Sequence, residues 1–100
     1  MIRGATPTYT MQFEEGIGDS IIDIILSFRQ DETDLHLKLS ERQIALNGDI
    51  ATCTLTQAQT LAFSAGAVER QVTVKLGGDK VQKTAVEKEA VLQSLYTEAV

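Results

Sequence analysis

TLTQAQTLAFSAGAVERQVTVKL, residues 54–76, is the stretch of sequence that decides the fold. It begins with the end of a strand and continues into a helical turn, where Thr56 and Gln59 have the T-x-x-Q spacing of a capping box. Gly66 then suits a left-handed backbone where the chain leaves the turn. A strand, a helical turn and a second strand in this order are how many two-sheet sandwiches cross from one sheet to the other. The stretch therefore indicates a β-sandwich.

The second strand of this stretch, residues 68–76, alternates between apolar and polar side chains, as a strand with one side on a core does. The apolar face holds Val68, Val72, Val74 and Leu76. The polar face holds Glu69, Gln71, Thr73 and Lys75. Arg70 is the exception on the apolar face, and we expect it to lie near the open end of the strand.

Similar alternation predicts strands before this stretch. They are Thr8–Phe13, Ser20–Arg29, Leu35–Leu39, Ile44–Leu46 and Ile50–Leu55. Asn47–Gly48 is typical of a type I′ hairpin, and Gly77–Gly78–Asp79 indicates another turn. Short strands at this spacing predict an all-β fold, an antiparallel β-sandwich that is immunoglobulin-like in plan. We expect six to seven strands and one short helical turn near residues 56–63.

Two segments also fit a helix. In Ser20–Arg29, a helix would bring Ile21, Ile25 and Phe28 to one side, but the density of β-branched residues and the lack of a capping pattern favour a strand. That strand would have Ile22, Ile24, Leu26 and Phe28 on one face. Residues 80–93 contain strand-like valines, yet their continuation also suits a helix, so the sequence leaves open whether residues 86–99 are strand or helix.

Length and charge set limits on the class of protein. The chain has 100 residues, of which 43% are apolar, and a net charge of −5. One domain over residues 1–100 is expected. Gly4 and Pro7 break regular structure, so residues 1–7 are expected to form an N-terminal arm. An acidic domain repels phosphate backbones, and direct nucleic-acid binding is therefore not expected.

Cysteine usage and hydropathy bear on the compartment. Cys53 is the single cysteine, which excludes an intrachain disulfide and fits synthesis in a reducing cytoplasm. The N-terminal residues lack the apolar core of a signal peptide. The longest dense apolar run, Ile21–Phe28, is too short to span a membrane. No membrane partner is expected.

Few residues suggest chemistry. His36 alternates with leucines and is expected to face solvent, with no second histidine or spaced cysteine to complete a metal site or a triad. Cys53 falls on a core face, where a cysteine behaves as a small apolar residue. Gly77–Gly78 is a hairpin turn and not a phosphate loop, because no Lys-Ser/Thr follows it. We assign no catalytic, cofactor-binding or metal-binding residue and do not expect an enzyme.

Acidic residues raise one alternative. Asp31, Glu32 and Asp34 are close in sequence, and Asp19 and Asp23 lie on neighbouring elements. Crowded carboxylates can bind Ca²⁺, but this spacing matches no defined calcium loop. A solvated turn is favoured, and weak calcium binding by Asp31–Asp34 stays open.

Three phrases of the sequence resemble a known family. Ile2–Thr8 is similar to an I-R-G-T-T-P-T start, Leu55–Phe63 to L-T-Q-E-E-T-L-K-F, and Leu95–Val100 to an L-x-x-E-V-L close. Together they resemble a family of small, mostly uncharacterised proteins encoded in prophages of Gram-positive bacteria. The L-T-Q-x-x-T turn is also similar to that of the immunoglobulin-like N-terminal domains of phage baseplate upper proteins. Ala58 and Ala99 depart from the pattern.

The resemblance implies a phage setting, and the pattern of strands implies how such a domain acts. A small open sandwich leaves unpaired strand edges, through which it could add strands from a neighbour or form a homo-oligomer. The leading hypothesis is a non-enzymatic virion or assembly protein of the tail, neck or baseplate, made in the bacterial host cytoplasm. The alternative is a β-sandwich module that binds a host-surface carbohydrate or a calcium-dependent ligand. Such a module would need an aromatic or acidic platform on loops at one end, whereas Tyr9 and Tyr96 lie near the termini and Asp31–Asp34 is the only acid-rich loop.

Overall fold

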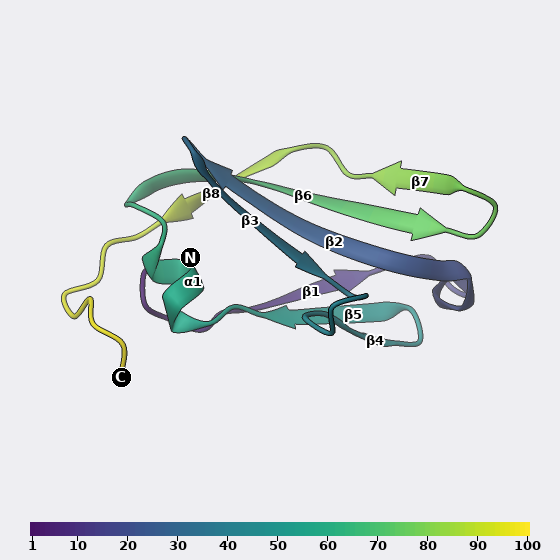
Figure 1. Ribbon diagram of the computed structural model, residues 1–100, viewed down its shortest axis with the longest axis horizontal. Helices are drawn as coiled ribbons and strands as arrows, with labels where there is room; N and C mark the ends of the chain where they lie inside the picture. The colour runs from purple at the N-terminus through teal and green to yellow at the C-terminus, as the bar shows by residue number, and fades with distance from the viewer.

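Two antiparallel sheets pack face to face in the computed structural model, which describes residues 1–100 (Figure 1). The elements follow the order β1 (Thr8–Gln12), η1 (Ile17–Ser20), β2 (Ile21–Gln30), β3 (Thr33–Lys38), β4 (Ala45–Asn47), β5 (Ile50–Thr54), α1 (Gln57–Leu61), β6 (Gly66–Leu76), β7 (Lys80–Lys83) and β8 (Glu87–Val91). The predicted antiparallel sandwich is confirmed. None of the helical segments is long and apolar enough to cross a membrane.

The strand order follows the immunoglobulin plan. The smaller sheet has the order β1-β5-β4, and the larger has β3-β2-β6, with both β7 and β8 paired to β6. If β1 to β6 are lettered B, C, C′, D, E and F, and the broken strand β7–β8 is G, the sheets read B-E-D and C′-C-F-G. The helical turn α1 makes the crossing from E to F. The position of strand A, beside β1, has no strand in it.

The last part of the chain differs from the expected six to seven strands, because residues 80–93 form two strands instead of one. β7 pairs with Thr73–Leu76 and β8 with Gly66–Arg70, so the two follow each other along β6. Between them Thr84 bonds to Val72 through both its N–H and its hydroxyl oxygen. The helical alternative for residues 86–99 is wrong: 87–91 form β8, and 92–100 contain no helix.

The capping box is present as predicted. Thr56 Oγ1 accepts from the N–H of Gln59, and the side chain of Gln59 accepts from the N–H of Thr56. The expected role of Gly66 is wrong, because the helix ends at Ala62 with a right-handed backbone. Gly66, with φ of +136°, is instead the first residue of β6.

The β4–β5 hairpin also differs in detail from the prediction. Asn47 pairs with Ile50, so the two-residue loop is Gly48–Asp49 and not Asn47–Gly48. Gly48 has φ of +62°, whereas Asp49 is not among the residues with positive φ. A type I′ turn needs positive φ at both positions, so that assignment is wrong.

The core lies between the sheets and is aliphatic, with two buried phenylalanines. β2 supplies Ile24, Leu26 and Phe28, as the alternation predicted. Ile22, expected on the same face, is instead 56% exposed, because a register shift between Ile21 and Asp23 disrupts the alternation there. The other buried residues include Leu37, Ile44, Ala51, Cys53, Leu55, Phe63, Val68 and Val91.

The segment before β1 lies on the sandwich. Residues 1–3 run beside the end of β8, where Leu92 donates to the Met1 carbonyl and Arg3 N–H donates to the Leu92 carbonyl. The Arg3 guanidinium donates to the carbonyl oxygens of Leu61 and Phe63 at 3.1 and 2.6 Å. Residues 1–7 thus join β8 to α1 instead of running along β1.

Candidate interaction surface

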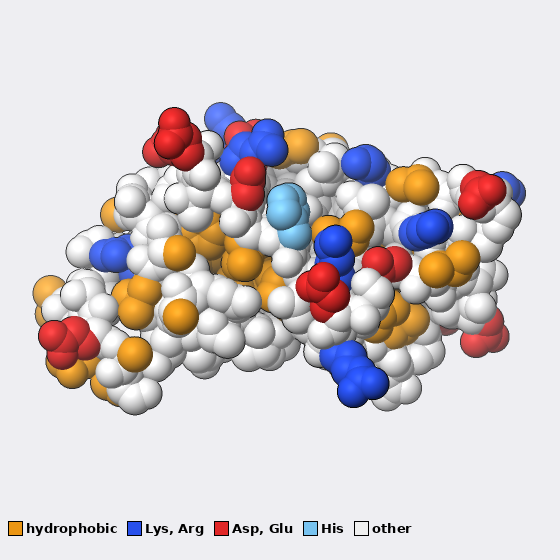
Figure 2. Space-filling view, in the orientation of Figure 1, with side chains coloured by type: hydrophobic (Ala, Val, Ile, Leu, Met, Phe, Trp, Pro, Cys, Tyr) orange, Lys and Arg blue, Asp and Glu red, His pale blue; other side chains and the backbone are white.

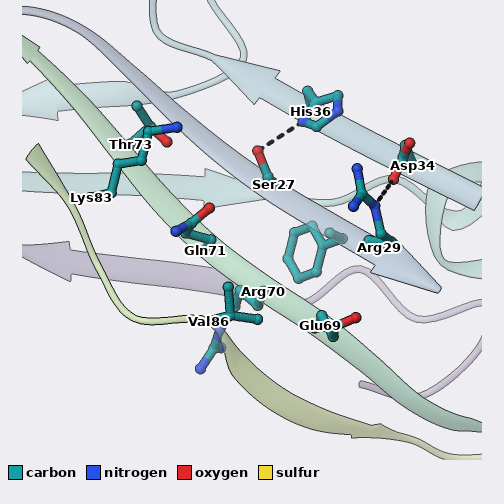
Figure 3. A pocket seen from close by; sticks show the side chains of 11 residues that line it. Ser27, Arg29, Asp34, His36, Glu69, Arg70, Gln71, Thr73, Lys83 and Val86 are labelled. Atoms are coloured by element: carbon teal, nitrogen blue, oxygen red, sulfur yellow. Dashed lines mark hydrogen bonds and ion pairs between the residues drawn. The ribbon is translucent and has the colours of Figure 1, made fainter. Parts of the chain in front are cut away.

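A shallow polar hollow lies on the outer face of the larger sheet, over β3, β2, β6 and β7 (Figure 3). Its volume is about 240 Å³. Ser27 and His36 are directly opposite in the β2–β3 register, and Ser27 Oγ lies 2.8 Å from His36 Nδ1. The alternation of side chains along the two strands does not single out this pair. His36 is exposed, as expected (Figure 2).

Charges of alternating sign cross this face in one row. Asp34 is opposite Arg29, Arg29 is opposite Glu69, and Glu69 is opposite Lys88. The Arg29 Nε donates to Asp34 Oδ1 at 2.9 Å. This hydrogen bond raises the pKa of Arg29. Opposite charges on adjacent strands favour this register over its neighbours.

The Ser27–His36 pair lacks the surroundings of a nucleophile and base. In a catalytic triad a carboxylate orients the histidine. The nearest candidate, Asp34, is bound instead by Arg29. Ser27 and His36 stand on an open sheet face where water reaches them. The arrangement suits a polar contact surface better than a reaction centre.

The acidic residues singled out for calcium are not brought together. Asp19 and Asp23 lie at the start of β2 and Asp31–Asp34 at its end, a separation on the order of 30 Å for a strand of this length. No three His, Cys, Asp or Glu side chains gather into a group that could hold a metal ion.

Asp23 has a local structural contact instead. Its carboxylate accepts from Ser40 N–H and Ser40 Oγ, both at 3.0 Å, and from the N–H of Ile24. Partial burial acts to raise the pKa of Asp23, but these hydrogen bonds outweigh it and lower that pKa. Asp23 therefore anchors the bend after β3.

Cys53 and Tyr9 are held inside the sandwich. Cys53 is 2% exposed, and burial raises the pKa of its thiol, so it is a poor nucleophile. The hydroxyl of Tyr9 donates to Glu89 Oε2 at 2.6 Å. Burial and this bond raise the pKa of Tyr9. Tyr9 is therefore part of an internal polar cluster, whereas Tyr96 is 59% exposed.

Arg70 completes this internal cluster. Its guanidinium binds Glu89 at 3.0 Å and Glu87 at 2.9 Å and lies 5.5 Å from the centre of the Tyr9 ring. The sequence placed Arg70 on the apolar face correctly, but the expected position near an open strand end is wrong, because Arg70 lies inside β6 and pairs with Phe28 on one side and Glu87 on the other. The charge is accommodated because two β8 carboxylates lie opposite.

Most strand edges of the sandwich are shielded. Residues 1–3 cover only the end of β8, at Ala90 and Leu92, and the rest of β8 carries the charged residues Glu87, Lys88 and Glu89. β7 has a lysine at each end, and charged side chains discourage edge pairing. β4 has only three residues. On β3, the outward N–H and C=O of Lys38 are already bound by Gln43, which leaves only Asp34 and His36 with free outward backbone groups.

The outer edge of β1 differs from all of these. Leu55 N–H donates to the Pro7 carbonyl and Phe13 N–H donates to the Asp49 carbonyl, so the odd-numbered residues of this segment face β5. The N–H and C=O groups of Thr8, Thr10 and Gln12 therefore face away from β5. β1 has no charged residue and no register shift, and no backbone hydrogen bond covers this side.

No family model, curated protein or solved structure matches the chain significantly.

Proposed function

We propose that this protein is a non-enzymatic phage structural or assembly protein, a component of the tail, neck or baseplate that acts through protein–protein contacts. The observation that carries the proposal is the open, uncharged edge of β1. Natural sandwiches cover such edges with other elements or place charged side chains on them. An edge without this protection can pair with a strand of another molecule. A protein that works by assembly needs such a surface.

The phage setting rests on the three phrases that resemble the prophage family. They meet at one end of the molecule, although they come from the two ends and the middle of the chain. Arg3 binds the carbonyls of Leu61 and Phe63, and Gly4 N–H donates to Thr60 Oγ1. The N–H of Val100 donates to the Gln57 side chain. The resemblance thus falls on one connected structural unit around α1.

The outer sheet face supports a contact role. Ser27 is bonded to His36, and Arg29 to Asp34, so these polar groups already have partners. Acidic and basic side chains are interspersed on the surface (Figure 2). Polar and charged side chains of this kind can form the rim of a protein contact.

Mass spectrometry of purified phage particles and assembly intermediates from an induced lysogen tests the proposal. The protein should be present in a fixed ratio to a known structural protein, and labelled antibody should place it on the tail, neck or baseplate by electron microscopy. A lysogen in which the gene is interrupted should release defective particles. Complete particles that lack the protein, with no intermediate that contains it, would remove the proposal.

A further inference from the structure

We infer that β1 is a dimerisation strand: two copies of this chain pair their β1 edges antiparallel about a two-fold axis at Thr10, which joins the two smaller sheets into one. The inference names the partner and surface for the proposed function, but it rests on the geometry of the edge and not on the phage setting.

The outward backbone groups of β1 set the register in which two copies can pair. Thr8, Thr10 and Gln12 carry the outward backbone groups of β1. Pairing about Thr10 places Thr8 opposite Gln12 of the copy and Thr10 opposite its own equivalent. Each of these residue pairs can exchange two backbone hydrogen bonds. A shift of the axis to Tyr9 or Met11 would lose one such pair.

The side chains that meet in this register are compatible. On the solvent face, threonine and glutamine lie opposite each other, and no charge meets a like charge. By contrast, the same operation on β7 brings Lys80 close to Lys83 of the copy, which is unfavourable. A chain of net charge −5 needs an uncharged contact to overcome the mutual repulsion of its copies.

A hollow lies beside the edge of β1. It has a volume of about 200 Å³ and lies between β1 and the break that separates β7 from β8. Tyr9, Met11, Leu26 and Val72 line it, with Thr84 and Glu87 at the break. In the proposed register Met11 of the copy lies opposite Tyr9. A flexible methionine beside an aromatic ring can fill such a space, with a favourable sulfur–ring contact.

The position of strand A, beside β1, is empty. In the immunoglobulin plan strand A pairs with strand B and covers its edge. Here residues 1–7 run to β8, and β1 has no neighbour on that side. The copy's β1 would occupy the place of strand A. An isologous contact of this kind closes as a dimer and does not propagate into a fibre.

Sedimentation equilibrium of the purified protein over the micromolar to millimolar range tests the inference. Wild type should form a dimer. Thr10→Lys puts two lysines opposite each other at the axis and should raise the dimer dissociation constant at least about tenfold. Thr52→Lys is the matched control, because Thr52 is opposite Thr10 on the neighbouring central strand, is also exposed, and lies off the edge. It should leave the dimer intact.

A cross-linking variant keeps the inference testable if Thr10→Lys does not fold. The two Thr10 Cα atoms of a hydrogen-bonded antiparallel pair lie about 5.5 Å apart, within reach of a disulfide. Thr10→Cys should therefore form a covalent dimer under mild oxidation, while Thr52→Cys should not. Cys53 is buried and should not compete.

A monomer at every concentration, equal loss of dimer in the two lysine variants, or no preference for the Thr10→Cys cross-link would each overturn the inference. These outcomes are separate from the particle experiment. A protein present in particles but monomeric in solution would retain the proposed function and lose the β1 dimer.

Discussion

Arg70 and Glu89 form an ion pair at 3.0 Å on the side of the larger sheet that faces the core, where their side chains are 29% and 17% exposed. The second oxygen of Glu89 accepts from the Tyr9 hydroxyl and lies 2.9 Å from the terminal ammonium of Met1. One carboxylate of β8 thus connects both sheets and the segment before β1. A half-buried charge with this many partners is costly to leave unpaired.

Replacing Arg70 should therefore destabilise the fold. Arg70→Met keeps the length of the side chain but removes the charge that Glu89 and Glu87 face. We expect the free energy of unfolding to fall by about 1–3 kcal/mol, less than for a fully buried pair because water reaches part of this one. Urea denaturation followed by circular dichroism measures the change.

Arg29→Met is the matched control for this variant. It breaks an arginine–carboxylate pair of similar length on the same sheet, 2.9 Å against 3.0 Å, but its side chains are 65% and 45% exposed. We expect no measurable loss of stability. Equal effects from the two variants would show that the internal cluster contributes no more than a surface pair.

Thr60 should be the most sensitive polar residue of α1. It is fully buried, and its Oγ1 donates to the Ala5 carbonyl at 2.8 Å and accepts from Gly4 N–H at 3.0 Å. Thr60→Val keeps the shape but leaves both backbone groups without this partner. We expect a loss of about 1–3 kcal/mol, measured by thermal or urea unfolding. Thr52→Val, at an exposed position, should stay within about 0.5 kcal/mol of wild type.

Gly18 should not tolerate a side chain. An added Cβ would collide with the carbonyl oxygen of Gly48, part of the backbone of the β4–β5 turn. Gly18→Ala should therefore lower the free energy of unfolding by at least about 2 kcal/mol. Gly77→Ala is the control, because nothing lies within 4 Å of its added Cβ and its φ is not positive. It should be neutral or slightly stabilising.

Asp49 should make stability depend on pH in the acid range. Its carboxylate accepts from the N–H groups of Gly16 and Gly18 at 2.9 and 2.8 Å, and these bonds lower the pKa of Asp49. A lowered folded pKa gives stabilisation that is fully present above the ordinary value of 3.8 and is lost as pH falls through the folded value.

Melting temperatures measured across this acid range check the prediction. Wild type should lose stability as pH falls below 3.8, and Asp49→Asn should be less stable at neutral pH with a flatter acid profile. Asp19→Asn is the control, since it removes an exposed carboxylate of the neighbouring η1. An unchanged acid profile in Asp49→Asn would refute the role of this contact.

The sequence by itself determined the two-layer β fold. Strands that alternate with a period of two need a second layer to bury their apolar face, and a chain with one short helical turn supplies that layer as another sheet. Ile24, Leu26, Phe28 and the Thr56–Gln59 capping box depend on neighbours within a few residues, and their positions were predicted correctly.

Only the tertiary structure decided which contacts join distant parts of the chain. These contacts join groups that are 31 to 89 residues apart in sequence. They are the cluster around Glu89, the hydrogen bonds between Thr60 and residues 4–5, and the contact between η1 and the β4–β5 turn. The tertiary structure also decided that residues 1–3 bond to the end of β8 and leave the outer edge of β1 open. A strand's alternation is the same at a covered edge and at a free one, because the backbone groups that distinguish them leave no trace in the side-chain pattern.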